Sequence, residues 1–276
     1  MEKERLRELQ FVQMKVMDEI HKICVEHNLR YYLIGGSALG AVRHKGFIPW
    51  DVDIDIAMPR KDYDLFINEY SKFLPKGYSC VDYRSDKNLY SPHALVVMDG
   101  TKLVQKDDYL NPQLKRYGIF VDILPLDQVP NDSVLWRRQQ KDIKRWANLR
   151  YRKLSLVFSS NNSLERLMKR ISRFFMCWIS LSYINRKQSE VMQRYDDMQE
   201  EECKEWCSMA SHYTFDKLTM PKGFFGIPAL MQFEDREYYV PEKIDNYLTH
   251  LFGDYLKLPG KEKQQEMINY FVDASW

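Results

Sequence analysis

The sequence predicts an α+β fold: a mixed β-sheet core that carries the functional site, an N-terminal helix, and a largely helical middle and C-terminal part. Three observations predict it. Apolar residues recur every three or four positions between residues 3 and 27, as in a helix with one packed face. Short β-prone runs occupy 31–124, and charge-rich segments of helical composition follow Ser133. We expect a catalytic core at 1–130 and a mostly helical region at 131–276 that packs on it and completes the substrate site.

The composition is that of a globular protein and argues against several classes. Of the 276 residues, 45% are hydrophobic and 29% are charged, which is ordinary globular usage. A formal net charge of +2 gives no global electrostatic case for nucleic acid. Five cysteines, an odd number, favour reduced thiols. The charged N-terminus predicts no secretory signal, and no apolar run approaches the length of about 18 residues that a membrane span needs. We therefore expect a cytoplasmic protein.

In the first half of the chain, strand signals follow the N-terminal helix. Strands are expected at 31–34, 53–58, 78–83, 94–98, 102–104 and 118–124. Pro59 is expected to stop the second of these strands, and a helix follows from Arg60 to about residue 73. Asp99-Gly100 is a hairpin signal between the runs at 94–98 and 102–104. Asp127, just past Pro125, is predicted to be a turn residue.

In the second half, helices dominate the prediction. They are expected from Ser133 onward and at 164–183, 188–206, 243–252 and 261–271, with a linker-like stretch at 159–163. The first of these helices is strongly basic, and its charges form either a solvated face or a guide for an anionic acceptor or anionic lipid. Cys203 and Cys207 are four residues apart on an expected helix, with His212 shortly after. A second cysteine pair is missing, so packing is favoured over a zinc site.

Three acids stand at alternate positions, Asp51, Asp53 and Asp55, between apolar residues. Period-two alternation is typical of a strand, so Asp53 and Asp55 should project from one face. Adjacent carboxylates repel each other unless a cation lies between them, and ligation by oxygen alone suits Mg²⁺ or Mn²⁺. The face of Asp51, which follows Pro49 closely, is left open. The alternative is a solvated acidic edge strand.

A glycine turn precedes these acids. Gly35, Gly36 and Ser37 follow a β-prone run and open a segment of helical composition. Glycine lets backbone N–H groups approach a phosphate, a serine cap opens the helix, and the helix N-terminus is partly positive. Arg43 and Lys45 add cationic donors further along. A phosphate cradle close to paired carboxylates is the minimum requirement for metal-assisted phosphoryl chemistry.

A single acid, Asp122, stands in the middle of the apolar strand 118–124. A carboxylate in a core strand is costly unless it is paired, hydrogen-bonded or bound to metal. Asp122 is therefore the candidate third metal ligand, brought by a strand beside 53–58. The alternative is a structural aspartate that caps a neighbouring loop.

These motifs resemble the signature of the LicD family of phosphotransferases, relatives of the fukutin proteins in the nucleotidyltransferase superfamily. The resemblance is dense over Gly35-Gly36-Ser37, Leu39-Gly40, Arg43-His44-Lys45-Gly46, Ile48-Pro49-Trp50-Asp51 and Asp53-Ile54-Asp55-Ile56. Further similarity lies around Phe120-Val121-Asp122-Ile123 and, more loosely, near Val240-Pro241 and Phe252-Gly253-Asp254-Tyr255. It implies a nucleotidyltransferase-like core and transfer of a phosphorylated alcohol, such as phosphocholine, to a glycan hydroxyl.

The resemblance also implies roles for individual residues. Asp53, Asp55 and Asp122 would hold Mg²⁺ or Mn²⁺, and Asp122 would take the acceptor proton or hold a metal that acidifies the hydroxyl. Donor phosphates would be bound by Gly35, Gly36, Ser37, Arg43, Lys45 and Asp51. The donor would be CDP-choline, CDP-glycerol or CDP-ribitol, with release of CMP. The acceptor would be a cell-surface glycan. If this glycan is lipid-linked, the protein would act at the inner face of the membrane.

Two other enzyme classes use similar acids. A nucleotidyltransferase would move the nucleoside monophosphate itself and release pyrophosphate. A glycosyltransferase would use Asp-x-Asp with Mn²⁺ to hold a sugar nucleotide, but it needs no glycine cradle upstream. A binding module with a relic site is disfavoured, because every expected carboxylate is present.

Overall fold

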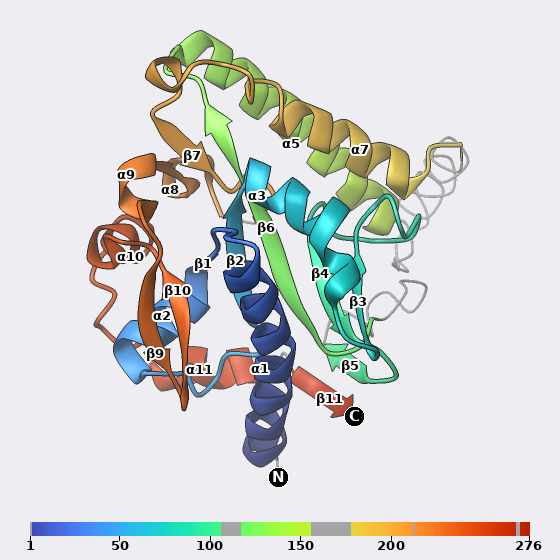
Figure 1. The fold of residues 1–276 in the computed structure, drawn as a ribbon, viewed down its shortest axis with the longest axis vertical. Helices are drawn as coiled ribbons and strands as arrows, with labels where there is room; N and C mark the ends of the chain where they lie inside the picture. Colours follow the sequence, from blue (N-terminus) through green and yellow to red (C-terminus); the bar gives the residue numbers. More distant parts are fainter. Residues whose placement is uncertain (1, 106–116, 156–177, 212, 269–270) are drawn as a thin grey trace, which may run out of the picture.

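A seven-stranded mixed sheet forms the centre of the protein (Figure 1). The computed structural model describes residues 2–105, 117–155, 178–211, 213–268 and 271–276. The main path of the sheet runs β1-β2-β6-β4-β3, and β7 and β8 extend it from the far end of β6. The strands are β1 (Tyr32–Leu33), β2 (Asp55–Pro59), β3 (Tyr78–Val81), β4 (Ala94–Met98), β6 (Phe120–Val129), β7 (Glu205–Cys207) and β8 (Thr219–Pro221). The predicted α+β class with a mixed sheet is confirmed.

Strands β2 and β6 form the only parallel pair in the described residues. Their register sets Asp55 opposite Asp122 and continues to Pro59 opposite Leu126. Residues opposite each other on neighbouring strands point to the same face of a sheet. The register therefore brings two acids from distant parts of the chain onto one face.

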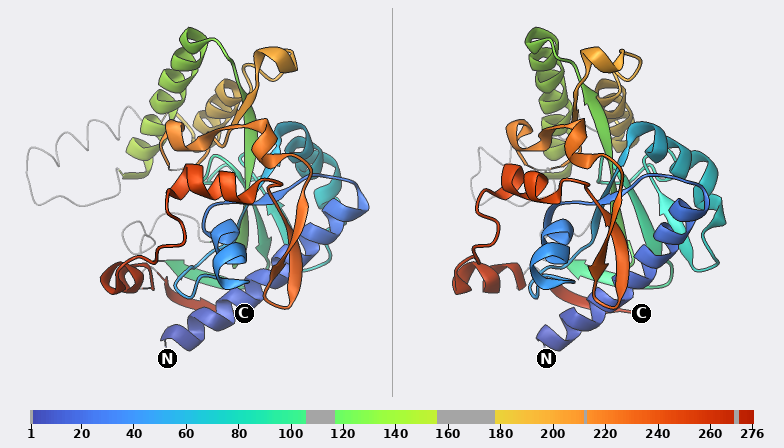
Figure 2. Two further views of the ribbon diagram at one scale, coloured as in Figure 1. Left: turned by 90° about the vertical axis from the view of Figure 1, so that its left-hand side faces the viewer. Right: turned by 60° about the vertical axis from the view of Figure 1, so that its left-hand side comes forward.

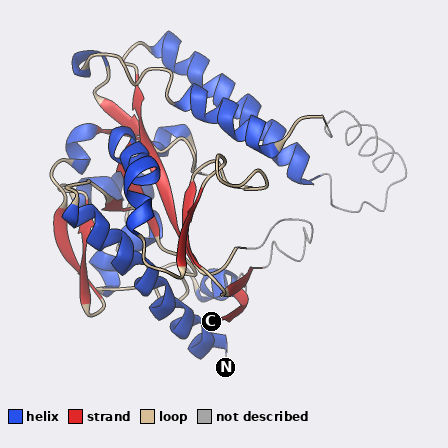
Figure 3. Cartoon of the chain, turned by 45° about the vertical axis from the view of Figure 1, so that its right-hand side comes forward, coloured by secondary structure: helices blue, strands red, loops and turns tan. Residues whose placement is uncertain are grey.

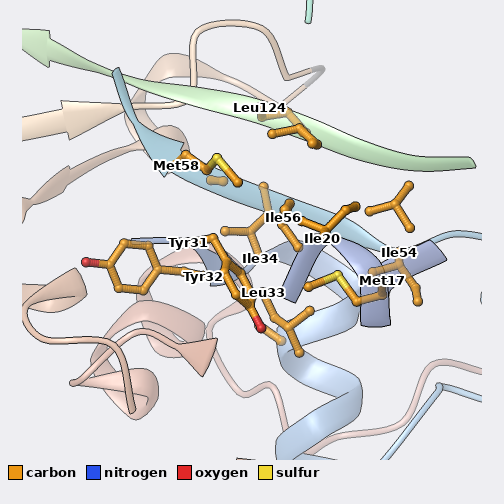
Figure 4. Close-up of a cluster of buried hydrophobic side chains, with 14 of the residues drawn as sticks. Met17, Ile20, Tyr31, Tyr32, Leu33, Ile34, Ile54, Ile56, Met58 and Leu124 are labelled. Carbon is orange, nitrogen blue, oxygen red and sulfur yellow. The ribbon is translucent and has the colours of Figure 1, made fainter. Parts of the chain in front are cut away.

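Helix α1 (Glu2–Glu26) covers one face of this pair. Its buried side chains include Met17 and Ile20, which lie in one cluster with Ile54 and Ile56 (Figure 4). Since the apolar residues of 52–56 alternate with the acids, this packing directs Asp53 and Asp55 to the opposite face. The predicted two-faced segment is thus confirmed, although regular pairing begins only at Asp55.

The remaining elements surround the sheet (Figures 2 and 3). The helices after α1 are α2 (Gly35–His44), α3 (Arg60–Leu65), α5 (Ser133–Ser155), α7 (Leu181–Met192), α8 (Phe215–Leu218), α9 (Lys222–Phe225), α10 (Ile244–Phe252) and α11 (Lys261–Ile268). A π-helical turn, Phe66–Tyr70, and the 3₁₀ turns Ser71–Phe73 and Glu200–Glu202 complete the helical segments. Outside the main sheet, β9 (Ala229–Phe233) pairs with β10 (Arg236–Val240), and β5 (Lys102–Gln105) pairs with β11 (Phe271–Ser275).

Four local predictions are wrong. The helix expected at 188–206 ends at Met192, and 205–207 is strand β7, so Cys203 and Cys207 do not share a helix. Strand β5 pairs with β11, so Asp99-Gly100 does not join a hairpin. Pro59 is itself the last paired residue of β2, opposite Leu126, so the pairing ends one residue later than predicted.

The fourth correction concerns Asp127. It is not a turn residue, because β6 continues to Val129 and buries Asp127 completely. Its Oδ1 accepts a hydrogen bond of 2.7 Å from Nε of Arg60, itself buried at the start of α3. The buried ion pair therefore joins the ends of the two parallel strands.

No helix in the described residues is long and apolar enough to cross a membrane. The linker expected at 159–163 and most of the helix expected at 164–183 lie outside the described residues.

Candidate active site

Asp53, Asp55 and Asp122 converge on the face of the sheet opposite α1. Asp53 lies just before β2, Asp55 is its first residue, and Asp122 lies in β6. One carboxylate oxygen from each lies within 4.8 Å of the other two. In the described part of the chain, no other group of three or more His, Cys, Asp or Glu side chains is placed to share a metal ion. The structure thus brings together the three residues that the sequence predicted as ligands.

The electrostatics of the three acids fit a cation. Burial, together with the charges of Asp55, Asp51 and Asp122, raises the pKa of Asp53 well above its usual range. Burial and the charges of Asp122 and Asp51 raise the pKa of Asp55 in the same way. A divalent cation would reverse this repulsion, and carboxylate oxygens are the ligands that Mg²⁺ and Mn²⁺ prefer. The residues present therefore fit such an ion.

The glycine turn lies directly against the acids. Gly35 has a φ of +54°, a conformation that favours glycine, and a Cβ built on it would lie 3.7 Å from Oδ2 of Asp55. A Cβ on Gly36 would overlap the carboxylate of Asp51. Burial raises the pKa of Asp51 to about 6. Gly36 is thus needed for the close approach of the backbone to Asp51, whereas Gly35 is favoured by its left-handed conformation. Asp51 faces the turn.

Ser37 has a different local role from the one predicted. The helix already begins at Gly35, with Ile34 as its N-cap residue, so Ser37 is not the cap. Its buried Oγ accepts a hydrogen bond of 3.0 Å from the backbone N–H of Asp55. Ser37 therefore ties the glycine turn to the start of β2.

Two buried glutamines of α1 hold the loop that carries Asp51 and Asp53. Nε2 of Gln10 donates to the backbone oxygen of Asp51 at 2.8 Å. Nε2 of Gln13 donates to the backbone oxygen of Val52, also at 2.8 Å. These polar residues, one turn apart on a packed helix face, are a signal that the sequence offered and that our prediction missed.

The C-terminal half supplies aromatic groups to the same place. The hydroxyl of Tyr247, on α10, accepts a hydrogen bond of 3.0 Å from the N–H of Gly35. Burial raises the pKa of Tyr213, and the charges of Asp55, Asp51 and Asp53 raise it further. Both tyrosines therefore lie within electrostatic reach of the acids, and nothing in the sequence singled them out.

His93 also contacts the acids. It immediately precedes β4, and its Nε2 lies 2.7 Å from Oδ1 of Asp122. The two side chains are only 15% and 16% exposed. No short-range sequence pattern links the two residues, so sequence analysis did not select His93.

The predicted cations Arg43 and Lys45 lie at the other end of α2. Nη1 of Arg43 donates to the backbone oxygen of Tyr255 at 2.9 Å. Lys45 is exposed and forms the left-handed C-cap of the helix. At a rise of about 1.5 Å per residue, Lys45 lies about 15 Å along the helix from Gly35. The structure does not bring these two cations to the carboxylates in the conformation described.

Cys203 and Cys207 are buried and belong to the packing. Sγ of Cys203 lies 3.9 Å from Sδ of Met198, and Cys207 pairs with Asp127 and Thr219 in the sheet. His212 lies outside the described residues.

Comparisons with known proteins point to the same chemistry. Residues 28–154 match the family model described as LicD/FKTN/FKRP, nucleotidyltransferase domain. The chain is 28% identical over 278 residues to lipopolysaccharide cholinephosphotransferase LicD of Haemophilus influenzae, and the match covers 96% of each chain. A match of 34 residues, 53% identical, relates it to ribitol 5-phosphate transferase FKRP of Homo sapiens and of Mus musculus, and covers 12% of this chain and 7% of those proteins.

Proposed function

Because residues 28–154 form a LicD-family nucleotidyltransferase domain and the chain is a LicD-like phosphotransferase, we propose that it transfers a phosphorylated alcohol from a CDP-linked donor to a hydroxyl of a cell-surface glycan. Phosphocholine or a similar group is transferred, and CMP is released. The convergence of Asp53, Asp55 and Asp122 beside the glycine turn is the observation that carries this proposal.

In this proposal Asp53, Asp55 and Asp122 hold Mg²⁺ or Mn²⁺. An ion held there would neutralise charge on the donor pyrophosphate and on the leaving CMP. The mutual repulsion of the three carboxylates without a cation supports this assignment. Ligation of a cation would also offset the cost of placing three carboxylates together on one partly buried face of the sheet.

The bonds and the proton balance as follows. The acceptor oxygen attacks the phosphorus that bears the alcohol, in line with the bridging oxygen of the pyrophosphate. A new P–O bond forms, the bond from that phosphorus to the bridging oxygen breaks, and the bridging oxygen leaves with CMP. The proton of the acceptor hydroxyl passes to a base; Asp122 either takes this proton or holds an ion that would acidify the hydroxyl.

The donor phosphates would lie at the glycine turn. The N–H of Gly35 already donates to Tyr247, so the next backbone N–H groups of α2, those of Gly36 and Ser37, would receive the anion. Ser37 and Asp51 border this turn, and we assign them to its support and to donor binding. A role for Arg43 or Lys45 requires their side chains to move towards the donor when it binds.

The names of the relatives guide the choice of substrate. One relative is named for cholinephosphate and lipopolysaccharide, and the other for ribitol 5-phosphate. We therefore propose CDP-choline, CDP-ribitol or CDP-glycerol as donors and a glycan as acceptor. A lipid-linked acceptor would place the reaction at the cytoplasmic face of the membrane.

Helix α5 supports a peripheral contact with such a membrane. Its exposed cations recur at intervals of three and four along one face: Arg137, Arg138, Lys141, Lys144, Arg145 and Arg152. The only acid of α5, Asp142, pairs with Arg194, which lies two residues beyond the end of α7. A face with one sign of charge is complementary to anionic lipid headgroups, which attract each nearby Lys or Arg by about 1 kcal/mol.

Product analysis tests the reaction. The protein is incubated with Mg²⁺, a glycan acceptor and each CDP-alcohol in turn, and we expect CMP with one of them. Pyrophosphate release from a nucleoside triphosphate would instead identify a nucleotidyltransferase. Release of a nucleoside diphosphate from a sugar nucleotide would identify a glycosyltransferase.

A further inference from the structure

We propose that His93 is a positioning residue of the metal site: it fixes the carboxylate of Asp122 through Oδ1, so that Oδ2 is presented to the cation. The inference rests on the metal site of the proposed function and deepens it. It assigns a role to a histidine that lies outside the three acids.

The hydrogen bond has a defined direction. An ionised carboxylate can only accept, so Nε2 of His93 must carry the proton that it shares with Asp122. The distance of 2.7 Å is that of a charge-assisted bond. Nδ1 of His93 is buried and has no hydrogen-bond partner. The bond to Asp122 is therefore the polar contact that orients the ring.

The backbone around His93 is itself held in place. The N–H of His93 donates to Oγ of Ser91, and that hydroxyl donates to the backbone oxygen of His93, both at 3.2 Å. Nδ2 of Asn185, completely buried on α7, donates to the backbone oxygens of Leu89 and Ser91. A loop fixed at both of these points gives His93 a defined position, and β4 begins at the next residue.

This arrangement matters for metal affinity. Asp122 is in the middle of the sheet, with Asp55 opposite it on β2 and Leu95 opposite it on β4. Without His93 its carboxylate could rotate, and the repulsion from Asp53 and Asp55 would favour orientations that turn it away from them. Hydrogen bonds to ligating carboxylates typically contribute 10–100-fold to metal affinity, and we expect about this factor here.

Two substitutions of His93 distinguish a role in positioning Asp122 from a role in packing alone. In His93→Gln the side-chain amide can reach the place of Nε2 and donate to Asp122, whereas in His93→Asn it is too short to do so. His27→Asn is the matched control, because His27 stacks on Tyr70 at the end of α1 and has no contact with the acids. Mn²⁺ affinity is measured by electron paramagnetic resonance, and thermal unfolding without metal reports on the fold.

We expect His93→Asn to weaken Mn²⁺ binding by about 10- to 100-fold, and His93→Gln to retain affinity within about threefold. The control should bind as the parent does, and in an Asp122→Asn background His93→Asn should have no further effect. Equal Mn²⁺ affinity of parent and His93→Asn would overturn the assignment of His93 but not the metal site. Absence of Mn²⁺ binding by the parent would overturn the metal site itself.

Discussion

Asp55 and Asp122 are register partners on the parallel strands β2 and β6. Their carboxylates therefore extend from one face of the sheet, where Asp53 joins them. The backbone N–H of Asp122 also donates to the oxygen of Ile54, at 3.1 Å, immediately before β2. The geometry of the candidate metal site is thus set by the hydrogen bonds of the central strand pair.

Removing one carboxylate of the site should lower activity without lowering stability. In Asp55→Asn one charge of a mutually repelling group is lost, so the melting temperature without metal should equal or exceed that of the parent. CMP release should fall by at least about 100-fold, because an ion that stabilises the transition state contributes several kcal/mol. Exposed Glu69 provides the control, Glu69→Gln. Retention of substantial turnover by Asp55→Asn would remove this residue from the catalytic site.

Without Mg²⁺, stability should fall as pH rises, and the stabilisation that Mg²⁺ provides should grow over the same range. The pKa values of Asp53 and Asp55 are raised well above the unfolded value of about 3.9, and that of Asp51 is raised to about 6. The folded protein then binds more protons than the unfolded chain, so the free energy of unfolding should fall as pH rises from about 4 through these raised values. Mg²⁺ competes with these protons.

The increase in melting temperature caused by Mg²⁺ should therefore be small near pH 5 and grow towards pH 8. Differential scanning calorimetry at several pH values, with Mg²⁺ or with EDTA, measures both trends. A Mg²⁺ effect that is independent of pH over this range would contradict the assignment of these carboxylates as ligands.

Gly36→Ala should weaken the site without unfolding the protein. The new methyl group would overlap the carboxylate of Asp51, although alanine favours the helix by about 1 kcal/mol relative to glycine. We expect CMP release to fall by about tenfold or more, with little change in melting temperature. Gly223→Ala is the matched control, because a Cβ there meets no atom within 4 Å. A similar effect of both variants on turnover would show that contact with Asp51 is not the cause.

The buried pair of Arg60 and Asp127 should be important for folding. Burial raises the pKa of Asp127, and Arg60 opposes this shift. Asp127→Asn leaves the Arg60 charge without its partner and should cost about 3–5 kcal/mol of unfolding free energy. Glu190→Gln, which removes an exposed partner of Arg186, should cost less than about 1 kcal/mol. Urea titration measures both, and equal small losses would contradict the assigned importance of the buried pair.

The basic face of α5 should direct the protein to anionic membranes. Replacement of Arg138, Lys141 and Arg145 by Gln should weaken binding to vesicles that contain an anionic lipid by about 100-fold, at about 1 kcal/mol for each cation. Replacement of exposed Lys61, Lys76 and Lys87 by Gln removes the same number of positive charges outside α5 and should weaken vesicle binding less. Co-sedimentation of vesicles at low and high salt measures binding. Equal binding to neutral vesicles, or an equal loss in the control, would exclude the proposed surface.

Local alternation predicted which acids converge on one face of the sheet. The period-two pattern at 51–56 predicted which side chains face the core, and the isolated carboxylate of an apolar strand predicted Asp122. Both signals involve only residues close together in the sequence. They are informative because an exposed apolar side chain or an unpaired buried charge would be energetically unfavourable. The LicD-family resemblance is likewise confirmed by the domain match.

The partners of these residues could not be predicted in the same way. Asp127 and Arg60 are joined only when β2 and β6 pair, so each appeared to belong to a local turn or helix start. Strand β7 has only three residues, too few for a periodic signal. His93 contacts Asp122 only because β4 lies beside β6.

The most direct test of the metal site is the anomalous scattering of Mn²⁺ in crystals of the protein soaked with this ion and a CDP-alcohol. Our account predicts an anomalous peak within coordination distance of oxygens of Asp53, Asp55 and Asp122, next to the donor pyrophosphate. A peak elsewhere, or none while the donor is bound, would contradict it.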